Sequence, residues 1–160
     1  MKKFFALLAA ALIMPLCASA QTTDLYSYEG EGFSIRLISR SDLRIASTSA
    51  DVTFFTDDDD RKADVDICVG AAAEGYSKAA TEVEDDDFFV NDKGTEMMIE
   101  DRSELRSFIR HIYRGRTSGV SLRVDVVDAS APKGKNVVYF KMPAEAVKEL
   151  VKAYDAARWR

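Results

Sequence analysis

Three arginines recur at four-residue intervals in the C-terminal half of the chain. Arg106, Arg110 and Arg114 fall at i, i+4 and i+8, a spacing that aligns side chains along one flank of an α-helix. Guanidinium groups carry paired N–H donors that match carboxylate, sulfate or phosphate oxygens, so this stripe could bind an anion. Arg116 and Arg123 follow shortly afterwards and extend the candidate set. The alternative is that these arginines face the chain's own acidic loops or are simply hydrated.

Charge is distributed unevenly along the sequence. Residues 51–104 carry 18 acidic and five basic side chains, whereas residues 105–160 carry 12 basic and five acidic ones. The whole chain has a formal net charge of −5. This value argues against a nucleic-acid-binding protein, because that function shows as a large basic excess. The polarised charge favours a surface that engages a protein, a peptide or an anionic glycan.

Two acidic runs, over 57–60 and 84–87, supply oxygen atoms of the kind that calcium prefers. Neither run has the spaced acidic residues and central glycine of a calcium-binding loop, and adjacent aspartates on an extended chain point to opposite sides. Most acidic runs form solvated loops, and we favour that interpretation here. Calcium-stabilised folding is the alternative. The candidate calcium ligands are Asp57, Asp59, Asp85 and Asp87.

The small number of histidines and cysteines limits the catalytic chemistry. With one histidine and two cysteines, one of them in the leader described below, the chain cannot form a structural zinc site of Cys and His ligands. Cys68 lies among aspartates, which raise rather than lower the pKa of a thiol. His111 lies off the apolar stripe of its helix, near the end where the backbone dipole favours positive charge. The inventory favours a non-enzymatic binding domain without a cofactor. A small hydrolase that uses carboxylates or His111 is the alternative.

The first 20 residues have the features of a secretory signal peptide. Two lysines precede an uninterrupted apolar run over residues 4–14, and small residues at 18–20 close the segment. This run is shorter than the roughly 20 residues needed to cross a bilayer, and no later apolar stretch is long enough. We therefore expect cleavage after residue 20, and export of residues 21–160, without a membrane span, to a bacterial periplasm or the extracellular space.

Period-two alternation of apolar and polar residues predicts an antiparallel sheet with one face on a core. The clearest example is Val120, Leu122, Val124 and Val126. Similar alternation occurs over residues 33–37, 52–54 and 65–71. Turn-forming residues predict hairpins between 88–90 and 95–99 and between about 119–128 and 136–142. Residues 74–87 lack this periodicity, and we expect a loop there.

Two segments have helical periodicity instead. Apolar residues at i, i+3, i+4 and i+7, with Asp101 as a capping residue, predict a helix over about 101–114. Pro143 and a second apolar stripe predict a helix over about 143–158. Strands followed by two late helices indicate an α+β fold. We expect one domain over 21–160, mainly an antiparallel sheet of about five to seven strands, with both helices packed on one face.

Overall fold

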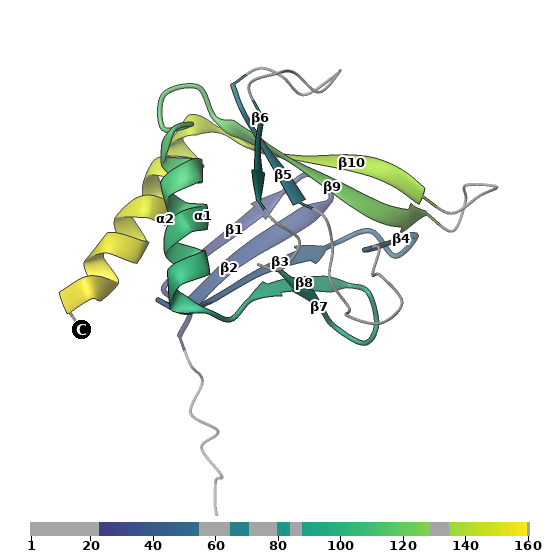
Figure 1. Ribbon diagram of the computed structural model, residues 1–160, viewed down its shortest axis with the longest axis horizontal. Coiled ribbons are helices and arrows are strands. Elements are labelled where there is room, and N and C mark those ends of the chain that lie inside the picture. The colour runs from purple at the N-terminus through teal and green to yellow at the C-terminus, as the bar shows by residue number, and fades with distance from the viewer. Residues whose placement is uncertain (1–22, 55–64, 71–79, 84–87, 129–134, 160) are drawn as a thin grey trace, which may run out of the picture.

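The alternating segments form two antiparallel sheets. The computed structural model describes residues 23–54, 65–70, 80–83, 88–128 and 135–159 (Figure 1). Each sheet has five strands within these residues. The first sheet has the order β1-β2-β3-β8-β7, made of β1 (Tyr26–Gly30), β2 (Phe33–Ser39), β3 (Asp42–Ser47), β8 (Glu96–Ile99) and β7 (Phe89–Val90). The second has the order β10-β9-β5-β6, with β4 paired to β9, and is made of β10 (Lys135–Met142), β9 (Val120–Asp128), β5 (Val65–Val69), β6 (Ala80–Val83) and β4 (Val52–Phe54).

The α+β class and the antiparallel pairing are confirmed, and the strand number is higher than predicted. Both predicted hairpins form, as β7–β8 and as β9–β10. The expected single sheet is corrected to two sheets. Residues 80–83, expected within a loop, form β6 because they pair with β5, placing Thr81 opposite Ile67 and Val83 opposite Val65. This pairing joins segments whose register cannot be read from local periodicity.

The two predicted helices are confirmed with shifts of one or two residues at their ends. They are α1 (Arg102–Tyr113) and α2 (Ala144–Ala156), and a short 3₁₀ helix, η2 (Ala157–Trp159), follows α2. The Asp101 carboxylate caps α1 by accepting bonds from the backbone N–H groups of Ser103 and Glu104. Pro143 is the extended residue before α2 rather than its first helical residue. None of the helices in the described part of the chain is long and apolar enough to cross a membrane.

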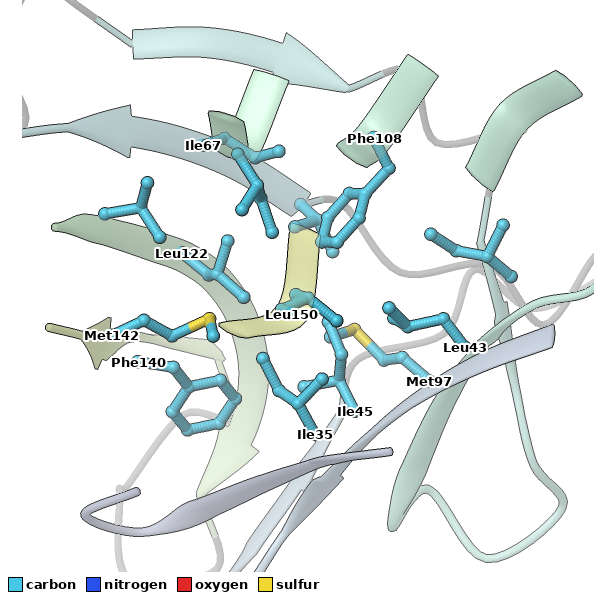
Figure 2. Close-up of a cluster of buried hydrophobic side chains, with 14 of the residues drawn as sticks. Ile35, Leu43, Ile45, Ile67, Met97, Phe108, Leu122, Phe140, Met142 and Leu150 are labelled. Atoms are coloured by element: carbon cyan, nitrogen blue, oxygen red, sulfur yellow. The ribbon is translucent and has the colours of Figure 1, made fainter. Parts of the chain in front are cut away.

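The core lies between the sheets and the helices. Figure 2 shows side chains from both sheets, among them Ile45 and Leu122, gathered with Leu150 of α2. Phe140 of β10 stacks on Phe33 of β2 with ring centroids 4.6 Å apart, which joins the two sheets directly. The helices α1 and α2 lie side by side (Figure 1), and both pack against strands. This packing leaves their outer surfaces to form the site described next.

Candidate functional site

Five arginines from three parts of the chain line one hollow beside α1. Its volume is about 590 Å³. The five arginines, called here the arginine cluster, are Arg40, Arg102, Arg106, Arg110 and Arg158. Arg40 comes from the turn between β2 and β3, three come from α1, and Arg158 comes from η2 after the end of α2. Asp101, Ser103 and Ser107 complete the lining.

The sequence of α1 explains why three of these arginines face outward together. The helix buries Leu105, Phe108, Ile109 and Ile112. Arg102, Arg106 and Arg110 are exposed, four residues apart, on another face of the same helix. Successive arginines are therefore separated by about 6 Å along the helix axis. The helix presents a row of guanidinium groups toward the hollow.

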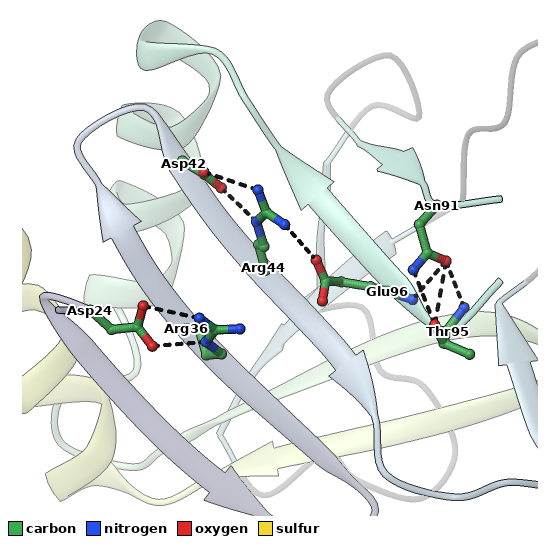
Figure 3. A network of polar contacts seen from close by, with 7 residues as sticks. All are labelled: Asp24, Arg36, Asp42, Arg44, Asn91, Thr95 and Glu96. Carbon is green, nitrogen blue, oxygen red and sulfur yellow. Dashed lines mark hydrogen bonds and ion pairs between the residues drawn. The ribbon is translucent and has the colours of Figure 1, made fainter. Parts of the chain in front are cut away.

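Among the residues that the structure describes, no carboxylate forms an ion pair with any of the five arginines of the cluster. Arginines on the first sheet are paired: Figure 3 shows Arg36 bonded to Asp24, and Arg44 bonded to Asp42 and Glu96. The distance from Nε of Arg36 to Oδ2 of Asp24 is 2.8 Å. The hydrogen bond from Arg36 holds the pKa of Asp24 below its ordinary value, the effect of a paired cation.

Asp101 is the carboxylate that borders this hollow, and it is already engaged by the helix. Its Oδ1 accepts hydrogen bonds from the backbone N–H of Ser103 at 2.6 Å and of Glu104 at 3.1 Å, and from the Ser103 hydroxyl. These bonds, the Ser103 hydroxyl first, lower the pKa of Asp101 and keep it ionised as a cap. The hollow therefore keeps a donor-rich, positively charged lining.

A second hollow of about 340 Å³ adjoins the first and shares four of its arginines. Its walls also include Ile109, Tyr113, Val151, Tyr154 and Asp155. The guanidinium carbon of Arg40 lies 4.9 Å from the centroid of the Tyr154 ring. A guanidinium over a ring face is held by the charge distribution of the ring, so this contact positions Arg40 without an acceptor oxygen for its N–H donors.

A third hollow, of about 480 Å³, continues toward the other end of the helix pair and shares Tyr113, Val151 and Asp155 with the second. Its cations are Arg116, Lys148 and Lys152. Arg116 lies over the Tyr113 ring at 4.3 Å, and Lys148 is paired with Glu145. The three adjoining hollows form a surface between α1 and α2 that we call the helix groove.

The structure separates the five arginines that the sequence singled out. Arg106 and Arg110 lie in the arginine cluster, and Arg116 lies in the third hollow. Arg114 is the residue that ends α1 and lies outside the three hollows. Arg123 lies on β9, where it is paired with Asp66 of β5 and with Asp125. The helical spacing therefore identified two members of the cluster.

Three other arginines of the cluster were missed by the sequence analysis. Arg102 lies four residues before Arg106, so the same spacing could have identified it. Arg158 lies within the segment predicted to continue the second helix, but it is exposed in η2, and its place beside α1 depends on how the two helices pack. Arg40 carries no local signal, because only tertiary packing brings the β2–β3 turn beside Tyr154.

The remaining candidate residues lie elsewhere. Cys68 is fully buried, and burial, followed by the nearby Asp66, raises the pKa of its thiol while Arg123 lowers it. His111 is half-buried on α1 and lies outside the three hollows. The residues that the structure describes hold no group of three or more His, Cys, Asp or Glu able to bind a metal ion. The calcium candidates Asp57, Asp59, Asp85 and Asp87 lie outside the described residues, as does the leader.

Comparison of the chain with protein-family models, with curated proteins and with solved structures finds no match. The chemistry of the helix groove is therefore argued from its own residues. Unpaired guanidinium groups around a hollow can neutralise and hydrogen-bond an anion, and each can do so with two parallel bonds. The groove is suited to binding rather than to proton transfer, because its donors are mostly arginines, which stay protonated.

Proposed function

We propose that the protein is an exported, non-enzymatic domain that binds an anionic partner through the helix groove. The observation that carries this proposal is the contrast between two sets of arginines. Five line one hollow without an ion pair among the described residues, whereas Arg36, Arg44 and Arg123 on the sheets are paired with carboxylates. Adjacent like charges repel, and an anion bound among them removes that cost.

The polarised charge of the chain also supports this proposal. The net charge of −5 opposes general adhesion to anions, so attraction is confined to a locally basic surface such as the helix groove. Carboxylates of a protein or peptide and the charged groups of an anionic glycan all satisfy arginine donors. Binding through such contacts weakens as salt is added, because exposed charges are screened.

Export is the second part of the proposal, and it is supported by the leader sequence over residues 1–20. Fractionation of cells that produce the full chain, with sequencing of the mature N-terminus, tests it. The expected result is a chain that begins at Gln21 in the periplasm or culture medium. A cytosolic chain that still begins at Met1 would contradict this part and leave the binding proposal standing.

Binding can be measured by fluorescence anisotropy with a labelled peptide of ten glutamates and a labelled sulfated oligosaccharide. The double variant Arg106→Gln/Arg110→Gln removes two cluster charges. The control Lys93→Gln/Lys141→Gln removes two exposed charges elsewhere, on the β7–β8 hairpin and on β10. We expect the cluster variant to lose about 10-fold or more in affinity for at least one probe, because charged hydrogen bonds are lost, and the control to lose less than about twofold. Equal losses in both variants would overturn the proposal.

A further inference from the structure

Two residues that line the second hollow each hold a buried polar atom without a hydrogen-bond partner. These atoms are the hydroxyl of Tyr154 and Nε of Arg40. Tyr154 is 4% exposed, and its ring lies beneath the Arg40 guanidinium. Nearly all buried polar groups in folded proteins are hydrogen-bonded, so two such atoms in contacting residues require an explanation.

Both atoms can donate, and their surroundings are rich in donors. Arg106, Arg110 and Arg158 line the same hollow. The carboxylate in its lining, Asp155, is exposed and also lines the third hollow. The stacking contact of Arg40 uses none of its N–H groups and is weaker than a bidentate bond to an oxyanion. An acceptor that enters the hollow can therefore draw Arg40 from the ring and reach the Tyr154 hydroxyl.

We infer that the second hollow is a subsite for a phosphomonoester group, held by Arg40, Arg106, Arg110 and Arg158 and by the hydroxyl of Tyr154. This inference rests on the proposed anion-binding function of the same groove. A phosphomonoester offers three terminal oxygens and close to two negative charges near neutral pH. A carboxylate offers two oxygens and one charge, and a sulfate monoester offers three oxygens and one charge. Of the three groups, the phosphomonoester combines three acceptor oxygens with the highest negative charge, which suits a hollow lined by four arginines.

The other wall of this hollow indicates where the remainder of the ligand lies. Ile109, Val151 and the exposed ring of Tyr113 are part of its lining, and Tyr113 and Val151 also line the third hollow. An organic group attached to the phosphate would pack against these side chains. The subsite is therefore suited to a phosphate ester with an apolar or aromatic portion next to the phosphate.

Isothermal titration with three ligands that share one ring tests the inference: phenyl phosphate, phenyl sulfate and benzoate. At pH 7.5 and low salt, we expect phenyl phosphate to bind at least about 10-fold more tightly than the other two. From pH 7.5 to pH 5 its affinity should fall, because the ester loses its second charge with a pKa of about 6. Phenyl sulfate keeps one charge and controls for titration of the groups around the hollow, namely the arginines, Tyr113, Tyr154 and Asp155. Equal affinities for the three ligands would overturn the inference.

The variant Tyr154→Phe removes one hydroxyl and retains the ring under Arg40. We expect phenyl phosphate affinity to fall by threefold or more with no loss of thermal stability, because the hydroxyl that is removed has no partner in the free protein. Tyr139→Phe, on β10, is the matched control and should leave affinity unchanged. Unchanged affinity in Tyr154→Phe would contradict the assigned role of the hydroxyl.

The outcomes separate this inference from the broader proposal. If the glutamate peptide binds through Arg106 and Arg110 and phenyl phosphate does not bind, the subsite is wrong and the anion-binding function stands. If the glutamate peptide, the sulfated oligosaccharide and phenyl phosphate all fail to bind, both proposals fail. Co-sedimentation with phosphatidylcholine vesicles containing phosphatidic acid would identify a membrane-borne phosphomonoester as the source. Binding of phenyl phosphate without co-sedimentation would identify a soluble one.

Discussion

Arg40 and Tyr154 join the β2–β3 turn to α2, with the guanidinium carbon 4.9 Å from the ring centroid. The contact positions the one member of the arginine cluster that comes from a turn between strands. Arg40→Met should change the free energy of unfolding by no more than about 1 kcal/mol, since the aliphatic stem is retained and a cation–π contact contributes about that much. Anion affinity should fall severalfold, because a donor of the cluster is lost. Urea unfolding and anisotropy measure the two effects, and a large loss of stability with unchanged affinity would assign Arg40 a purely structural role.

Folding stability should depend on pH through Tyr26, which joins β1 to α2. Its hydroxyl donates a hydrogen bond of 3.1 Å to the carbonyl oxygen of Ala146. Burial first, followed by the charges of Glu149 and Tyr28, raises the pKa of Tyr26 from 10.0 to about 12. The folded chain therefore retains this proton between about pH 10 and 12 while the unfolded chain releases it, so the stabilisation is complete below pH 10 and is lost toward pH 12.

Comparison of the protein with Tyr26→Phe isolates this effect from other groups that titrate in the same range. At pH 9 the variant should be less stable by about 1 kcal/mol, because it lacks the hydrogen bond. At pH 11 the difference should be smaller. Urea unfolding at the two pH values measures the difference, and a gap that widens with pH would contradict the assignment.

Gly119 connects α1 to β9 where the backbone approaches the end of β10. Its φ is +83°, and a Cβ atom there would lie 2.6 Å from the carbonyl oxygen of Met142. Gly119→Ala should therefore destabilise the fold through both a left-handed backbone and a clash with backbone. Gly32→Ala, at φ +77° with no atom within 4 Å of the added Cβ, should cost only about 1–2 kcal/mol for the left-handed conformation. Equal urea midpoints for the two variants would contradict this prediction, because the clash with Met142 would then add nothing to the destabilisation.

Cys68 should react slowly in the folded protein. The residue is fully buried in β5, and burial raises the pKa of its thiol, so both access and thiolate concentration are low. In a Cys17→Ser background, a thiol reagent should modify native protein at least about 100-fold more slowly than urea-unfolded protein, because modification requires opening of the sheet. Comparable rates in the two states would contradict the burial of Cys68.

Secondary structure was predictable where apolar residues recur regularly over a long, uninterrupted segment. Val120 to Val126 identified β9, and Leu105, Phe108 and Ile112 identified α1, because each pattern reports one buried face. The division into two sheets was not predictable, since it depends on which strands pair. The pairing of Arg123 with Asp66 illustrates this: it follows from the register of β9 on β5, which adjoining residues do not encode.

The candidate site was partly predictable for the same reason. Helical spacing placed Arg106 and Arg110 on one exposed flank of α1, and both are members of the cluster. The same spacing could not add Arg40 or Arg158, because these residues reach the cluster by tertiary packing from a turn and from η2. Tyr154 lies on the buried face of α2, as its place among the apolar residues of this helix indicates, but its unpartnered hydroxyl is visible only in the structure.

The most direct test of the anion-binding proposal is NMR observation of the arginine Nε–Hε groups during titration with the glutamate peptide and the sulfated oligosaccharide. We predict saturable shifts for Arg40, Arg102, Arg106, Arg110 and Arg158, with smaller changes for Arg36, Arg44 and Arg123, whose guanidinium groups are already bonded to carboxylates. Shifts that do not saturate with either ligand, or that are equally large in the two sets of arginines, would contradict the proposal that this groove is the binding site.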